Sequence, residues 1–293
     1  MGIKGKLIVR VLFLLVLAVL AIGGASYRFS TSHALEEARE KGDIIFNYIM
    51  AQRDFFREEQ RSLAMEIVEH DRFYPTLMSG FVVTRATWDR FKKSLPGYSF
   101  KQATVDPLFP ANKADADELD IISQFRNDGS KKRLEGTMQK GGEEYFYIAT
   151  PIKVTAKGCL KCHGNPADAP KDQVDAYGSV NGYNWKLDDT VATFIVYVSI
   201  SKAMEQAVRT TGILVIIGVG IMVVMIILMW LFITRSVVTP ILTLSARTEE
   251  ISLGKNLGDS ISHNANDEIG QLANAINRLR ISLVKILQKV QKK

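Results

Sequence analysis

Two apolar runs that contain no charged residue dominate the hydrophobic pattern of the chain. The run 212–233 has about 22 residues and the run 11–26 has about 16. A helix needs about 20 such residues to cross the hydrocarbon core of a bilayer. The second run therefore predicts a membrane span. The first reaches this length only if residues 7–10 extend it, so it is either an uncleaved anchor or a signal peptide removed after export.

Between the two runs, the pattern predicts a long helix followed by strands. Apolar residues recur at helical spacing along one face, with charged residues between them, at Ile45, Ile49, Phe56, Leu63 and Ile67. Further on, YFYIATPI (145–152) and TFIVYVSI (193–200) are rich in aromatic and β-branched residues, which favour strands. This order, with no alternation of strands and helices, predicts an α+β domain with an antiparallel sheet. The pattern fits a PAS-like fold and equally fits other α+β sandwiches.

The C-terminal region has the pattern of a coiled coil. Apolar residues three and four apart fill three heptads: Ile269, Leu272, Ile276, Leu279, Leu283, Ile286 and Val290. A weaker stripe precedes them at Ile241, Leu244, Thr248 and Ile251, and the polar stretch 255–266 predicts a connector outside the core. Two short amphipathic helices cannot bury such stripes alone, so we expect a homodimer with a parallel four-helix bundle. An inert dimerisation coil is the alternative.

The charge distribution predicts how the chain crosses the membrane. Residues 1–10 carry three basic groups and no acid, and residues 235–293 carry nine basic and five acidic groups. Residues 28–210 carry 25 basic and 26 acidic groups, so the net charge of +6 lies outside them. Basic loops stay in the cytoplasm, so we expect both termini there and the middle segment in the periplasm of a bacterium. The basic residues form no single stripe, so nothing indicates nucleic-acid binding.

Four parts are therefore expected in a two-pass protein of the bacterial inner membrane. They are the N-terminal tip and first span (1–27), an exported domain (28–210), a second span (211–234) and a cytoplasmic tail (235–293).

The only two cysteines of the chain lie in the exported segment, at Cys159 and Cys162, and His163 follows directly. Free thiols do not persist in an oxidising compartment without a use. A zinc site wants four ligands, and the exported segment has no second cysteine pair. A disulfide between these cysteines would close a trivial loop and add little stability. A redox pair of the thioredoxin type remains an alternative, although no βαβ unit is predicted around it.

Cys-x-x-Cys-His is also the motif to which c-type haem is attached. Two thiols three residues apart can add to the two vinyl groups of one porphyrin, and the following histidine is then the proximal iron ligand. The spacing therefore predicts one covalent haem c, held by Cys159 and Cys162 with His163 on the iron.

Longer stretches resemble known families. CLKCHGNPADAP, YGSVNGYNWK, NKADADE and YFYIATPI are similar to exported PAS-like sensor domains that carry a single covalent c-type haem. Pro240, Gly254 and DEIGQL (267–272) resemble a HAMP signalling module over about 235–287. The first resemblance implies sensing of redox state, a small gas or another ligand, and the second implies a dimeric relay.

The other site residues are predicted from their types and positions. Some relatives use cysteine as the distal iron ligand, but this chain has no third cysteine, and Met78 or His70 is the candidate instead. Further candidates are Tyr177, Tyr183 and Trp185 for the haem pocket, and Arg53 and Lys101 for the haem propionates.

We therefore expect a membrane-bound haem sensor that signals through HAMP to a separate cytoplasmic effector, and we expect no enzyme activity. The alternatives are a membrane-anchored monohaem cytochrome for periplasmic electron transfer, and a haemless sensor of a small organic ligand.

Overall fold

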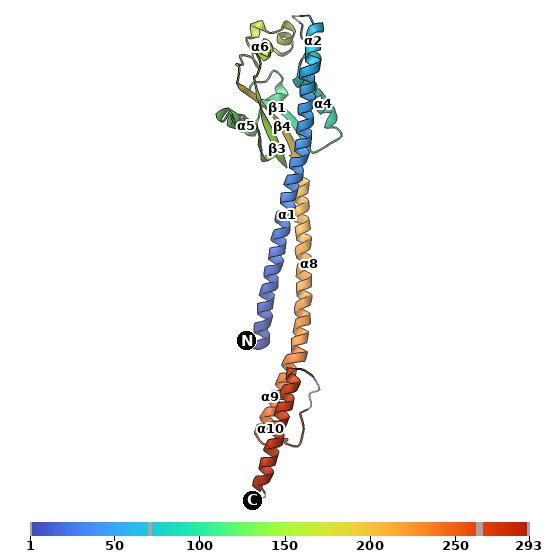
Figure 1. Cartoon of the computed structure of the whole chain (residues 1–293), viewed down its shortest axis with the longest axis vertical. Coiled ribbons are helices and arrows are strands. Elements are labelled where there is room, and N and C mark those ends of the chain that lie inside the picture. Colours follow the sequence, from blue (N-terminus) through green and yellow to red (C-terminus); the bar gives the residue numbers. More distant parts are fainter. Residues whose placement is uncertain (1, 70–71, 262–265, 292–293) are drawn as a thin grey trace. The chain divides into compact units, whose positions relative to one another are not determined.

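The computed structural model describes residues 2–69, 72–261 and 266–291 and contains two compact units (Figure 1). One unit is Tyr27–Arg209, and the other combines Met1–Ser26 with Thr210–Lys293. The elements in chain order are α1 (Ile3–Phe55), the π-helix η1 (Phe56–Gln60), α2 (Arg61–Ile67), α3 (Pro75–Met78), α4 (Gly80–Phe91), β1 (Tyr98–Thr104), η2 (Pro110–Asn112), α5 (Ala116–Asn127), β2 (Leu134–Lys140), β3 (Glu143–Lys153), α6 (Lys157–His163), η3 (Pro166–Asp168), α7 (Lys171–Tyr177), β4 (Thr190–Ser199), α8 (Ser201–Ile233), the π-helix η4 (Thr234–Val238), α9 (Thr239–Ser252) and α10 (Glu268–Gln291).

The first unit is built on a four-stranded antiparallel sheet in the order β1-β4-β3-β2. The long N-terminal helix, the antiparallel sheet and the two predicted strands are confirmed, the strands as β3 and β4. Strands β1 and β2 are not evident from the sequence. They are the edge strands, and their burial alternates or is partial, so polar residues interrupt the apolar pattern that marks β4.

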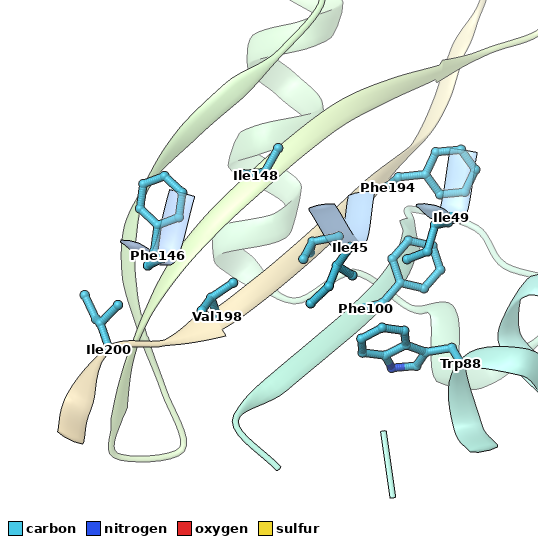
Figure 2. Close-up of a cluster of buried hydrophobic side chains, with 11 residues drawn as sticks. Ile45, Ile49, Trp88, Phe100, Phe146, Ile148, Phe194, Val198 and Ile200 are labelled. Atoms are coloured by element: carbon cyan, nitrogen blue, oxygen red, sulfur yellow. The ribbon is translucent and has the colours of Figure 1, made fainter. Parts of the chain in front are cut away.

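Helices cover both faces of this sheet. On one face, Ile45 and Ile49 of α1 and Trp88 of α4 pack against strand residues, as Figure 2 shows. The strand residues in this cluster include Phe100, Phe146, Ile148, Phe194, Val196 and Val198. On the other face, α5 packs against Ile195 and Tyr197. Strand β4 is therefore buried on both faces, which explains its nearly continuous apolar sequence.

The predicted apolar face of residues 45–67 continues only as far as Phe56. Ile45, Ile49 and Phe56 are buried, whereas Leu63 is 60% exposed and Ile67 is 83% exposed. The π-helix η1 lies between them. A π-turn has more residues per turn than an α-helix, so it rotates the following residues away from the face that precedes it.

Among the described residues, two helices are long and apolar enough to cross a membrane, with mean hydropathies of 2.8 and 3.1 in their most apolar windows. The two apolar segments lie in the same unit and approach each other closely. A Cβ atom on Gly23 would lie 3.0 Å from Val215, and one on Gly218 would lie 3.4 Å from Val19. Small residues at such crossings let two apolar helices pack at short range.

In the same unit, α9 and α10 enclose a small core. Leu244 and Ile251 of α9 are buried against Ala273 of α10, and Ile269, Ile276 and Leu283 pack on them. The prediction that the whole connector lies outside the core is wrong, because Ile261 is buried and Leu257 packs against the same cluster. The Asn277 side chain holds Ile261 there by bonds to both its backbone N–H (2.9 Å) and its carbonyl (2.6 Å). The alternate heptad residues Leu272, Leu279 and Ile286 remain exposed.

Candidate functional site

The short helix α6 carries Cys159, Cys162 and His163. The two cysteines are three residues apart, and residues at this spacing in a helix are neighbours on its surface. Both thiols are free and partly buried. All three side chains line one cavity of about 710 Å³. Figure 1 shows α2 and α6 toward the same end of the sheet. Arg61 of α2 also lines the cavity.

The His163 ring is fixed in position from two sides. Its Nδ1 atom lies 2.7 Å from the carbonyl oxygen of Gly182, and its plane stacks on Trp185 with 3.9 Å between ring centroids and 5° between planes. A backbone carbonyl can only accept, so Nδ1 carries the proton and Nε2 keeps its lone pair. Burial lowers the pKa of His163, which also favours the neutral ring. A neutral imidazole with a free Nε2 is the form that binds a metal.

The segment 182–185 also holds the end of α6 by its backbone. Trp185 N–H donates to the carbonyl of His163 over 3.0 Å, and Asn184 N–H donates to that of Gly164 over 2.8 Å. Directly after the motif, a Cβ atom on Gly164 would lie 2.4 Å from the Leu160 carbonyl oxygen. Only glycine therefore fits where the chain leaves the helix.

Two buried polar side chains, Gln173 and Tyr183, form hydrogen bonds that hold the backbone of the Cys-x-x-Cys-His motif. Gln173 Nε2 donates to the Cys162 carbonyl over 2.6 Å and to the Tyr183 hydroxyl over 3.3 Å. The Tyr183 hydroxyl in turn donates to the Gly178 carbonyl over 3.0 Å. Burial raises the pKa of the Cys162 thiol, which keeps it protonated at neutral pH.

The predicted pocket residues divide into two groups. Tyr177 and Trp185 line the cavity, whereas Tyr183 is buried outside its wall, in the hydrogen bonds described above. Met78 of α3 also lines the cavity and is only 9% exposed, with the N–H of Tyr74 at 3.3 Å from its sulfur. A second thioether, that of Met50, lines the same cavity. His70 lies outside the described residues.

Some supporting residues are not predicted from the sequence. Gly182 N–H donates to Asp106 over 2.9 Å, which ties this loop to the chain after β1. Gly182 has φ +78°, and a Cβ atom there would lie 2.6 Å from Leu108. The glycines of the segment 178–182 signal a special backbone conformation, but nothing in the sequence pairs Gly182 with Asp106 or Gln173 with Cys162.

The site fits a covalently held porphyrin better than a zinc ion. Two neighbouring thiols, an imidazole with a free Nε2 and a large cavity with several aromatic walls meet at one place. Ligand pockets commonly enclose about 300–1,000 Å³. In the described part of the chain, no three His, Cys, Asp or Glu side chains are grouped so as to hold a metal ion alone. The four protein ligands of a structural zinc are therefore not assembled there.

The structure thus combines an α+β domain with a C-terminal pair of packed helices. Comparison with known families matches residues 31–199 to the Tll0287-like family and residues 232–285 to the HAMP domain. Because the first match covers more than half of the chain, this chain belongs to the Tll0287-like family.

A solved structure also resembles this chain. The crystal structure of the cyanobacterial heme-protein Tll0287 is similar to it, with 19% identity and a TM-score of 0.42, over 55% of this chain and 95% of that one. No curated protein matches the chain.

Proposed function

We propose that this chain is a two-pass inner-membrane receptor whose periplasmic domain carries one covalent haem c and reports its redox state or a bound small gas. The observation that carries the proposal is the bond from His163 Nδ1 to the Gly182 carbonyl, in the cavity that Cys159 and Cys162 also line. This bond leaves Nε2 free in the one histidine that follows the cysteine pair. A thiol redox pair has no need of an imidazole oriented in this way.

The roles of the residues follow from their positions. Cys159 and Cys162 would form the thioether bonds, and His163 would be the proximal ligand. Met78 would be the distal ligand, because its thioether is buried in the same cavity. Tyr177 and Trp185 would pack against the ring. When bound, the haem supplies a redox centre whose potential depends on its axial ligands.

The domain boundaries that we propose follow the charge distribution and the apolar segments. Residues 1–27 form the cytoplasmic tip and first span, 28–210 the periplasmic domain, 211–234 the second span, and 235–293 the cytoplasmic HAMP domain with its coil. The basic excess outside residues 28–210 supports this orientation.

The first unit is joined firmly to the start of α8. The N–H of Ile200 donates to the Glu144 carbonyl over 2.9 Å, and the N–H of Glu144 donates to the Ser201 hydroxyl over 2.7 Å. A change at β3 or β4 is therefore passed to Ser201, where α8 begins. In the proposed relay, α8 carries it to HAMP in a homodimer, and a separate cytoplasmic protein reads the bundle. Such a relay requires two bundle states of different stability.

A denaturing-gel haem stain tests the proposal directly. The full chain is produced with c-type maturation, beside the variant Cys159→Ala/Cys162→Ala and the single variant His163→Ala. We expect stain in the wild type, none in the double variant, and in His163→Ala a retained stain with altered absorption bands. An unstained wild-type band would contradict the haem proposal and favour the alternative that Cys159 and Cys162 form a redox pair.

A further inference from the structure

The side chain of Arg53 is a charged group enclosed in the cavity wall. It lies in the last turn of α1, and its guanidinium carbon is 4.3 Å from the ring centroid of Phe81 and 4.4 Å from that of Phe194. Its Nη1 atom is buried and, within the part of the chain that the structure describes, has no hydrogen-bond partner. The cation therefore lies over two aromatic rings that stack on each other, with at least one of its N–H groups unused.

No acid among the described residues neutralises this charge by an ion pair. The neighbouring Asp54 is engaged by Arg57, with 3.1 Å between the charged atoms, and Arg57 also bonds Glu58 at 2.7 Å. Burial lowers the pKa of Arg53 to about 10, partly offset by the charge of Asp54. Stacking on two rings recovers part of the cost of burial. A buried cation still normally has a hydrogen-bonded anion beside it.

A second unsatisfied polar group lines the same cavity as Arg53. Gln102 of β1 is 3% exposed, and its Oε1 atom is buried without a partner in the described structure. Its Nε2 atom is bonded to the carbonyl of Phe81, the residue whose ring stacks on Arg53. Gln102 is also the cross-strand partner of Phe194, the other stacking ring. Arg53 and Gln102 both line the cavity that holds Cys159, Cys162 and His163.

We infer that Arg53, together with Gln102, forms a carboxylate-binding site in the wall of this cavity. The guanidinium would donate to the carboxylate, and the Gln102 oxygen would accept from a water held beside it. Under the proposed function, on which this assignment rests, the carboxylate is a propionate of the haem. The same chemistry would also accept the carboxylate of a free organic acid.

Lys101, the other candidate for this role, is placed differently. Its Nζ atom bonds the buried Glu118 carboxylate at 2.6 Å and the Lys113 carbonyl at 2.7 Å. It is not among the residues that line the cavity. Of the two residues predicted to bind haem propionates, only Arg53 therefore lines the cavity.

A carboxylate bound by Arg53 would lie where α1 contacts β4. Arg53 itself belongs to α1, the helix that also contains the first apolar run, and Phe194 belongs to β4, which leads into α8. Occupation of the site would therefore restrain the end of α1 against β4.

The test compares Arg53→Gln, Arg53→Met and Arg53→Lys in the full chain, with Arg90→Gln as the control for losing one arginine from the same unit. Arg90 of α4 is exposed, bonds the carbonyl of Ala86 in its own helix and does not line the cavity. If the partner is a propionate, Arg53→Gln and Arg53→Met keep covalent haem and shift its midpoint potential downward, because an unneutralised carboxylate favours ferric iron. Arg53→Lys restores most of the wild-type potential, and Arg90→Gln leaves it unchanged. If Arg53 had only a structural role, the positive charge of lysine in Arg53→Lys would not restore the potential.

A haem-free arm separates the two sources of the carboxylate. The Cys159→Ala/Cys162→Ala chain is melted in sodium acetate and in sodium chloride of equal ionic strength, with and without Arg53→Gln. The site is assigned to a free acid if two results are obtained together. The midpoint potential of the haem is the same in Arg53→Gln as in the wild type, and acetate raises the melting temperature of the haem-free chain only when Arg53 is present. No effect of Arg53 in either arm overturns the inference. If the wild type carries no haem, the proposed function fails, and the acetate arm alone decides whether the carboxylate site exists.

Discussion

The Nδ1 atom of His163 and the carbonyl oxygen of Gly182 are 2.7 Å apart, although 19 positions separate the two residues in the chain. Gly182 can make this bond because its backbone adopts φ +78°, and because no Cβ atom separates it from Leu108. The orientation of the proposed iron ligand thus depends on a glycine in a different loop.

Replacing Gly182 with alanine should therefore disturb the site more than replacing another glycine of positive φ. Gly141 is the matched control, because it has φ +59° and a Cβ atom there would meet no atom within 4 Å. We expect Gly141→Ala to lose about 1 kcal/mol or slightly more through backbone strain. Gly182→Ala should lose about 2–4 kcal/mol, because overpacking against Leu108 adds to the strain.

Urea denaturation measures both losses, and the absorption spectrum of the haem-loaded chain reports on His163. The spectrum should change in Gly182→Ala and stay as in the wild type in Gly141→Ala. Equal stability losses with identical spectra would show that the close approach to Leu108 does not fix the histidine.

The buried carboxylate of Glu118 predicts how stability changes with pH. It is fully buried and bonded to Lys101 (2.6 Å), Lys140 (2.5 Å) and the Tyr197 hydroxyl (2.7 Å). Burial by itself would raise the pKa of Glu118, but these hydrogen bonds bring it below the ordinary value of 4.5. The unfolded chain therefore binds a proton at a higher pH than the folded chain. The resulting stability is present above about pH 4.5 and is lost as the pH falls through the folded pKa.

Glu118→Gln should accordingly cost about 3–5 kcal/mol at pH 7, because the partly buried Lys101 loses its carboxylate partner and Lys140 is left with Asp115. The difference in unfolding free energy between the variant and the wild type should stay constant between pH 7 and pH 5 and shrink below about pH 4.5. Unfolding midpoints in urea across this range test it, with the exposed Asp117→Asn as control. A difference that persists undiminished to pH 3 would contradict the assignment.

The exposed heptad residues of α10 predict where two chains meet. Leu279 is 63% exposed in the single chain, whereas Ile276 and Leu283 pack on the core of its own unit. Leu279→Cys should form disulfide-linked dimers in membranes, whereas Asn274→Cys, at an outer heptad position, should remain monomeric. If haem state is the signal, the rate for Leu279→Cys should differ between oxidised and reduced protein. Identical rates would favour the electron-transfer alternative.

The two thioethers of the cavity give a matched pair for the distal ligand. We expect Met78→Leu to open a coordination position, so that the reduced protein binds carbon monoxide and its absorption bands shift. Met50→Leu should leave the spectrum of the wild type unchanged, because both leucines preserve the apolar volume. Absorption spectra with and without carbon monoxide distinguish the variants. If Met50→Leu binds carbon monoxide and Met78→Leu does not, Met50 is the distal ligand. If neither variant changes the spectrum, neither methionine is the distal ligand.

The sequence alone determined the features that depend on local pattern. The apolar run 212–233 is long enough to be a membrane span, and the pattern of 193–200 is that of a doubly buried strand. Ile269, Ile276 and Leu283, which are seven residues apart, pack in the core of the tail. The two cysteines and the histidine of the motif are close together in sequence, so one short helix is enough to bring them together. Such features follow from the residue types within one element and need no knowledge of the rest of the chain.

The tertiary structure decided whatever depends on partners far apart in sequence. Strands β1 and β2 are stabilised by pairing with β4 and β3, although their own sequences are mixed. Ile261, in a stretch whose composition is polar, is buried because Asn277 binds its backbone. Arg53 and Lys101 are equal candidates in the sequence, but Glu118 engages Lys101, whereas the rings of Phe81 and Phe194 hold Arg53 in the cavity wall. Burial and hydrogen bonding between distant segments determine these outcomes, and a linear pattern does not contain that information.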